Sequence, residues 1–149
     1  MNTDPNSVTA TQAEQVKHAV LAMPMAQTLQ LQFRHIEPGH VELELPISEA
    51  FSFRPGQLQA TAVFAAADFA AVAAAGTLLE PGWANATIDA TLKIVGPARG
   101  AHLRARGRVV DAGRLLTVCA AEVYAVDAND KETLCATLLG TARNIDPAR

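Results

Sequence analysis

Apolar residues follow two different periods along this chain of 149 residues. In residues 11–23 the spacing is helical, and Thr11 and Glu14 form the Thr-x-x-Glu pattern of a helix capping box. Pro24 follows and would end such a helix. The apolar positions of this segment are Val16, Ala19, Val20 and Met23. The pattern predicts a short amphipathic N-terminal helix over residues 11–23.

The next segments alternate strictly between apolar and polar residues. Alternation runs through residues 29–34 and again through 41–45, with the turn Glu37-Pro-Gly-His40 between them. A period of two predicts strands, so we expect a hairpin with one face in water. From residue 46 to 59 the period fails, and Phe51 and Phe53 fall in what we predict to be an irregular loop.

One long apolar run follows, from Ala60 to Leu79, and Asp68 is its only charged residue. The run is long enough to raise the question of a membrane span. However, it is mostly alanine, and an acid in the middle of a bilayer costs about 2.5–3.5 kcal/mol. We therefore predict a buried helix of a soluble protein. A carboxylate on so apolar an element must be paired, neutralised or used in chemistry.

Four more strands are predicted downstream, over residues 88–94, 103–109, 115–126 and 133–142, with turn sequences between them. We find no linker or internal repeat. The order of elements predicts an α+β fold, in which an antiparallel sheet wraps around the long central helix and an additional helix lies at the N-terminus. We expect residues 1–10 to be disordered and residues 11–149 to form a single domain.

Composition narrows the functional classes. Half of the residues are hydrophobic, 18% are charged and the net charge is −3, so nothing favours nucleic acid or an anionic membrane as a partner. The first seven residues lack the basic and apolar regions of a secretory signal, which makes the cytoplasm the expected location. Cys119 and Cys135 are interpreted as buried thiols, and the histidines show no spacing that predicts a metal site.

Residues 25–145 resemble the hotdog-fold acyl-CoA thioesterases of the phenylacetate-degradation type. That family opens its central helix with Gly-x-x-His-Gly-Gly and places an acid about nine residues after the histidine. Here Gly56-Gln-Leu-Gln-Ala-Thr61 and Ala66-Ala-Asp68 occupy those places, and Ile94-Val-Gly-Pro-Ala98 matches the end of a family strand. The chain departs from the family at Gln59, which replaces the histidine, and at Phe53, which replaces a polar residue.

The resemblance implies a hotdog fold, a catalytic role for Asp68, and a homodimer or dimer of dimers with acyl-CoA bound between subunits. Coenzyme A would then be part of the substrate, and no separate cofactor is expected. Thioester hydrolysis needs a base or nucleophile on one side of the carbonyl group and hydrogen-bond donors on the other. Asp68 suits the first role. The free N–H groups of a helix beginning near Gln59, from Ala60 to Val63, suit the second.

Two sets of candidate site residues follow. The catalytic candidates are Asp68, Gln59 and Thr61, and the substrate-binding candidates are Phe53, Gly56, Ala60, Phe64, Val72, Trp83 and Arg99. Each catalytic candidate has a structural alternative. Asp68 can be a structural acid, Gln59 a helix cap or a solvated side chain, and Thr61 a helix-start residue.

A row of basic residues, His102, Arg104, Arg106 and Arg108, shares one face of a predicted strand. Such a row is usually a solvated sheet face. A second interpretation is that one or two of these arginines, with Arg99, hold the phosphates of coenzyme A.

Two functional classes stay open. The first is an acyl-CoA thioesterase that uses Asp68. The second is a non-catalytic hotdog protein that binds an acyl-CoA or a lipid-like ligand, or serves in assembly. A dehydratase of the same fold ranks third, because that reaction would require an Asp and a His in one loop.

Overall fold

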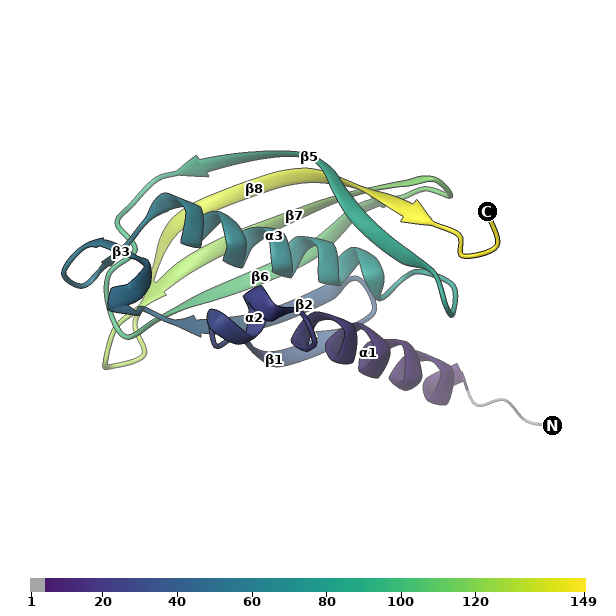
Figure 1. The fold of residues 1–149 in the computed structure, drawn as a ribbon, viewed down its shortest axis with the longest axis horizontal. Coiled ribbons are helices and arrows are strands. Elements are labelled where there is room, and N and C mark those ends of the chain that lie inside the picture. The colour runs from purple at the N-terminus through teal and green to yellow at the C-terminus, as the bar shows by residue number, and fades with distance from the viewer. Residues whose placement is uncertain (1–4) are drawn as a thin grey trace.

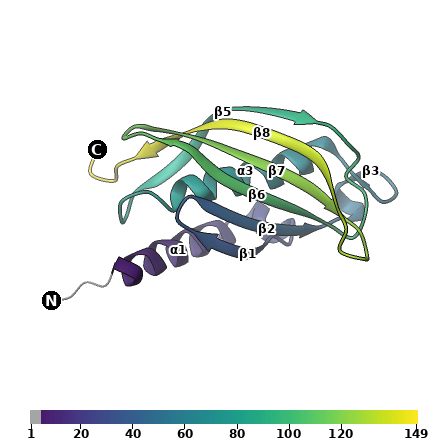
Figure 2. The same cartoon turned by 180° about the vertical axis from the view of Figure 1, so that it is seen from behind.

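The computed structural model describes residues 5–149 and consists of one curved antiparallel sheet wrapped around a long helix (Figure 1). The helix α3 spans Ala60–Gly76. In spatial order the strands are β1 (Gln32–Glu37), β2 (His40–Pro46), β6 (His102–Ala112), β7 (Leu116–Val126), β8 (Glu132–Ile145) and β5 (Ala84–Ile94). Seen from behind, the sheet covers α3 along its length (Figure 2). The predicted α+β architecture is confirmed.

The central helix is buried as predicted, with eleven of its 17 residues buried. Most of them are alanines, whose small side chains allow the sheet to approach closely. The closest approach is at Gly107 in β6, where a Cβ atom would overlap the carbonyl oxygen of Ala70. No helix in the described part of the chain is long and apolar enough to cross a membrane.

The N-terminal helix is present, but its predicted bounds were wrong at both ends. The helix α1 spans Pro5–Leu21, and a second short helix, α2, spans Pro24–Thr28. Proline is well tolerated in the first turn of a helix, so Pro5 begins α1 and Pro24 begins α2. Pro24 therefore does more than end the preceding helix. The prediction that residues 1–10 are disordered lies partly outside the described residues, since residues 1–4 are not described, and it stays a prediction.

The segment predicted to be an irregular loop contains short ordered pieces. A 3₁₀ turn, η1 (Glu49–Phe51), precedes a two-stranded hairpin of β3 (Ser52–Arg54) and β4 (Gln57–Leu58). Gly56 has a φ of 75° in the hairpin turn, a conformation that glycine adopts without strain. This hairpin lies at the end of the molecule where α3 begins (Figure 1).

Ion pairs occupy the basic row on the outer face of the sheet. Arg104 contacts Glu44 and Glu132, and Arg106 contacts Glu42 and Glu132. Hydrogen bonds from Arg106 and then Arg104 lower the pKa of Glu132 to about 2. The row is thus part of a structural charge network, which favours the first of its two interpretations.

Candidate active site around Asp68

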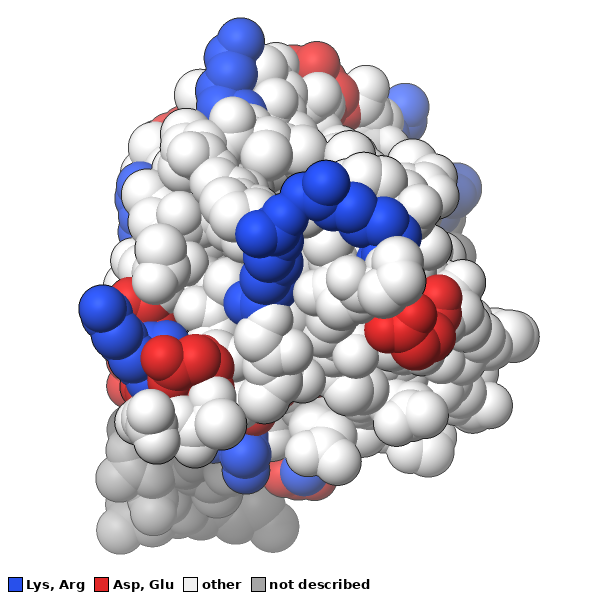
Figure 3. Space-filling view, turned by 90° about the vertical axis from the view of Figure 1, so that its left-hand side faces the viewer, with Lys and Arg blue, Asp and Glu red and all other residues white. Residues whose placement is uncertain are grey.

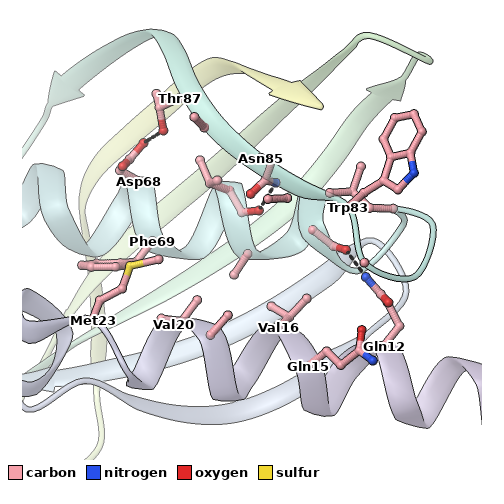
Figure 4. A pocket seen from close by; sticks show the side chains of 18 residues that line it. Gln12, Gln15, Val16, Val20, Met23, Asp68, Phe69, Trp83, Asn85 and Thr87 are labelled. Carbon is pink, nitrogen blue, oxygen red and sulfur yellow. Dashed lines mark hydrogen bonds between the residues drawn. The ribbon is translucent and has the colours of Figure 1, made fainter. Parts of the chain in front are cut away.

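Asp68 lies in the middle of α3, half-buried, and faces the strand β5 (Figure 4). The hydroxyl of Thr87, near the start of β5, donates a hydrogen bond of 2.8 Å to Asp68 Oδ1. Nearby, the side-chain amide of Asn85 donates to the carbonyl oxygen of Val72 at 3.0 Å. These two bonds hold the first part of β5 against the face of α3 that carries the carboxylate.

Burial raises the pKa of Asp68 above its ordinary value, and the hydrogen bond from Thr87 partly opposes the rise. Burial, together with the nearby charge of Asp68, also raises the pKa of the Cys119 thiol to about 11. A carboxylate with a raised pKa is a better proton acceptor than one in water, which suits it to general-base chemistry. The same environment keeps Cys119 a thiol at neutral pH, so it is not a competing nucleophile.

Asp68 lines a cavity of about 410 Å³ between α1, α3 and the start of β5. The walls are mostly apolar, and Figure 4 shows their side chains converging from these three elements. The labelled lining side chains besides Asp68 are Gln12, Gln15, Val16, Val20, Met23, Phe69, Trp83, Asn85 and Thr87. A volume in this range, mostly apolar walls and one carboxylate are typical of a small-molecule site.

Two of the predicted binding residues, Val72 and Trp83, line this cavity with Asp68. The other two catalytic candidates lie elsewhere. Gln59 and Thr61 line a separate hollow of about 270 Å³ at the start of α3. Nine residues of helix separate Gln59 from Asp68, which is about 13 Å at 1.5 Å per residue. Within one chain these residues do not act on the same atom.

The start of α3 has fewer free donors than predicted. Gln59 is the N-cap residue, as expected, and its carbonyl oxygen accepts hydrogen bonds from the N–H groups of Ala62 and Val63. Among the described hydrogen bonds, the backbone N–H groups of Ala60 and Thr61 have no acceptor. The Gln59 side-chain amide donates to Thr61 Oγ1 at 3.0 Å. The N–H groups that are free to bind a ligand here are therefore those of Ala60 and Thr61, not those of the whole first turn.

Of the remaining candidates, Phe53 and Gly56 belong to the β3–β4 hairpin and Arg99 contacts it. Phe53 is exposed, and the guanidinium of Arg54 lies 5.4 Å from the centre of its ring. Arg54 and Arg99 both donate hydrogen bonds to Oε1 of Gln57. Figure 3, which looks onto this end of the molecule, shows basic side chains close together on its surface. Gly56 is at the hairpin turn, whereas Phe64 is an exposed side chain on α3.

Sequence reasoning missed several residues of the Asp68 cavity. Thr87 is the most important of them, since it bonds the carboxylate from 19 positions downstream. Phe69 and Met23 also line the cavity. The helical spacing of Val16, Val20 and Met23 indicated an apolar stripe in the sequence. No sequence pattern indicated that this stripe would face Asp68.

The fold and a substantial part of the sequence are shared with solved thioesterase structures. A thioesterase family protein from Silicibacter pomeroyi is 31% identical with a TM-score of 0.86, and the match covers 90% of this chain and 98% of that one. The PaaI protein from the phenylacetic acid degradation operon of Escherichia coli is 20% identical with a TM-score of 0.78, over 91% and 95% of the two chains.

A thioesterase from Haemophilus influenzae is 18% identical with a TM-score of 0.77, over 88% and 89% of the two chains. At these lower identities the likeness shows the fold alone. No family model and no curated protein sequence matches the chain.

Proposed function

This chain belongs to the thioesterase family and has its hotdog fold, and on that premise we propose that it hydrolyses the thioester of an acyl- or aryl-coenzyme A with Asp68 as the general base or nucleophile. The observation that carries the proposal is the position of Asp68. It is a half-buried carboxyl group with a raised pKa, at the edge of an apolar cavity large enough for an acyl group.

As a general base, Asp68 would take a proton from a water molecule while the water oxygen attacks the thioester carbonyl carbon. The carbon–sulfur bond then breaks, and the thiolate of coenzyme A leaves and takes up a proton. As a nucleophile, the carboxylate would attack the carbonyl carbon itself, and the carbon–sulfur bond would break as the thiolate of coenzyme A leaves and takes up a proton. Water would then hydrolyse the resulting anhydride between the acyl group and Asp68. In both routes the oxyanion needs donors on the far side of the carbonyl group.

We propose that these donors come from a second copy of the chain. The N–H groups of Ala60 and Thr61 are roughly 10–13 Å along α3 from Asp68 of the same chain, too far to contact the same carbonyl group. The strand β5 is an edge of the sheet, and within residues 5–149 it pairs only with β8. Its outer edge is a template for pairing, and two-fold pairing runs the two α3 helices in opposite directions.

The side chains exposed on this edge support the same arrangement. Ile88 and Ile94 on β5 are 57% and 50% exposed, so the strand offers apolar surface that a second copy could cover. Because Thr87 on β5 bonds Asp68, a copy paired with β5 would lie next to the carboxylate. A homodimer, or a dimer of such dimers, would thus complete each site with the helix start of the partner, where Gln59 and Thr61 lie.

Arg99 and Arg54 are the residues we propose for the phosphates of coenzyme A. Their two guanidinium groups converge on a neutral amide oxygen, that of Gln57. A phosphate would replace this weak acceptor with charge-assisted hydrogen bonds. The outer-face arginines are already bonded to carboxylates and suit this role less well. Coenzyme A enters as part of the substrate.

The alternative is a hotdog protein that binds an acyl-CoA without hydrolysing it. What favours it is the contact of Gln59, whose amide is bonded to Thr61 of its own helix. A glutamine can orient a water molecule but does not transfer a proton at neutral pH.

The Asp68→Asn variant tests the catalytic role. Free thiol release from an acyl-CoA panel is expected to fall at least roughly a hundredfold, because an amide is not a base. The variant is expected to fold. The pKa of Asp68 is raised in the folded state, so the folded protein loses stability as pH rises from the pKa of the unfolded chain to that of the folded protein. Removing this charge is therefore not expected to lower the free energy of unfolding at neutral pH.

Asp111→Asn is the matched control, since Asp111 is an exposed carboxylate on β6, three strands away from β5 in the sheet. It is expected to keep wild-type activity. Equal rates in Asp68→Asn and the wild type would contradict the proposed role. A wild-type protein that binds a non-hydrolysable acyl-CoA in calorimetry, yet hydrolyses no thioester of the panel, would establish the alternative.

A further inference from the structure

We infer that the cavity between α1, α3 and β5 holds the acyl group of the substrate, and that the N-terminal helix α1 sets which acyl chain lengths fit. This inference rests on the proposed function, because it takes Asp68 to mark the position of the thioester. It assigns to α1 a role in specificity, and it names medium-length unbranched acyl chains as the preferred class.

The wall provided by α1 is one continuous stripe. Val16, Ala19 and Val20 follow the spacing i, i+3, i+4, so they share one face of α1, and Met23 lies just beyond the end of the helix. All four residues line the cavity. An amphipathic helix ordinarily buries such a stripe by packing it directly on the protein core. Here part of the stripe borders open space, and a ligand with apolar surface would complete its burial.

The opposite wall explains why space is left. Val72, Ala73 and Gly76 line the cavity from α3, and two of these three residues are small. Because Asp68, Val72 and Gly76 are four residues apart, they lie in one row along α3, with the carboxylate at one end. The row places apolar space directly beyond the carboxylate, where the acyl part of a thioester would extend.

The two helices meet at the other end of this row. The side-chain amide of Gln12 donates a hydrogen bond of 3.0 Å to the carbonyl oxygen of Gly76. At the same place Val16 packs on Gly76 so closely that a Cβ atom there would lie 3.3 Å from Val16 Cγ2. These contacts bring α1 against α3 and limit how far a chain can run between them.

The distance between the carboxylate and this contact predicts the chain length. Eight helical residues separate Asp68 from Gly76, which is about 12 Å. An extended chain advances about 3.3–3.6 Å for every three bonds, so this length holds roughly ten bonds. We therefore expect a preference for acyl groups of about eight to ten carbons, such as octanoyl and decanoyl. The cavity volume of about 410 Å³ is in the range of pockets for small ligands.

Two variants of α1 with opposite effects test the inference. The measurement is kcat/KM across acetyl-, butyryl-, hexanoyl-, octanoyl-, decanoyl-, dodecanoyl-, palmitoyl- and phenylacetyl-CoA. Ala19→Leu narrows the cavity and is expected to reduce the rate with decanoyl-CoA roughly tenfold relative to butyryl-CoA. Val16→Ala removes the contact at Gly76 and is expected to move the optimum towards dodecanoyl-CoA.

Ala22→Leu is the matched control, because Ala22 directly follows α1, is exposed and lies outside the cavity lining. It is expected to keep the wild-type profile. Activity with butyryl-CoA reports that each variant is folded and has an intact reaction centre, since a short acyl group does not reach the altered wall.

The outcomes separate this inference from the proposed function. An active enzyme whose chain-length profile is unchanged in both α1 variants would overturn the inference alone, as would a wild-type optimum at acetyl- or palmitoyl-CoA. If the wild type hydrolyses nothing, the binding of non-hydrolysable thioether analogues with the same acyl groups is measured by calorimetry. Binding that depends on chain length, and shifts in the two variants, would support the inference while overturning hydrolysis. No binding at all would overturn both.

Discussion

The Asp68 carboxyl is balanced between two opposing influences, and this balance decides what it does at neutral pH. Burial on an alanine-rich helix raises its pKa, while the Thr87 hydroxyl stabilises the ionised form. Without burial the group would be a weak base, and without Thr87 it would hold its proton more tightly. In its proposed role as a general base, Asp68 has to be deprotonated at the working pH, so we assign Thr87 the role of a positioning residue for it.

The pH dependence of Thr87→Val tests this balance. Removing the hydroxyl removes the influence that lowers the pKa of Asp68, so this pKa should rise further. The acid limb of the kcat/KM profile is expected to move to higher pH, while the rate above the limb stays close to the wild-type rate. Thr91→Val is the control, because Thr91 is an exposed threonine of the same strand. Its acid limb in the kcat/KM profile is expected to stay at the wild-type pH. An acid limb that does not move in Thr87→Val, or that moves to lower pH, would contradict the assigned role.

At the scale of elements, the contact between α3 and β6 positions Asp68 relative to the sheet. Alanines on the helix and Gly107 on the strand allow the two backbones to approach so closely that a Cβ atom at Gly107 does not fit. The neighbouring atoms there belong to the backbone of Ala70 and Ala71, which cannot move aside as a side chain can. The position of the middle of α3 depends on this contact.

Gly107→Ala is therefore expected to destabilise the protein strongly, by about 3 kcal/mol or more, since overpacking typically costs 1–3 kcal/mol where side chains can adjust. The same substitution at Gly76 is the control. There the nearest atom is a methyl group of Val16 at 3.3 Å, and alanine favours the helix, so little change is expected. Denaturant unfolding of both variants measures the difference. Equal stability of the two would contradict the proposed close approach.

The order of elements was predictable from local pattern, whereas helix ends were not. The long helix that carries Asp68, its start near Gln59 and all six long strands were identified, because the hydrophobic period and the turn residues are local signals. The start of α1 was predicted six residues late, because the capping-box pattern of Thr11 and Glu14 lies within the helix and not at its start. Pro24 was assigned as a helix end, although it begins α2.

At the scale of the whole molecule, one chain carries both parts of the proposed active site but holds them apart. Asp68 lies beside the edge strand β5, and the helix start with its free N–H groups lies at the end of the molecule (Figure 1). A homodimer through β5 is the arrangement that we propose to bring them together. Activity should therefore depend on assembly.

Ile88→Lys tests this dependence, because a charge on the outer edge of β5 opposes pairing with a second copy. We expect the mass in analytical ultracentrifugation to shift towards the monomer and the specific activity to fall roughly tenfold or more at low protein concentration. Val110→Lys changes an equally exposed apolar residue on β6, three strands away in the sheet, and is expected to leave mass and activity unchanged. A monomeric and fully active Ile88→Lys variant would contradict the composite site.

Residues close together in the chain determined the elements and pointed to Asp68, because helical and strand periods, caps and turns act over a few positions. The tertiary structure decided what surrounds that carboxylate. Thr87 reaches it from 19 residues away, the stripe of α1 closes a cavity over it, and Gln59 on the same helix is directed elsewhere. These contacts depend on how a curved sheet and two helices pack. Local sequence pattern fixes which face of an element is apolar, but it does not specify which other element that face will meet.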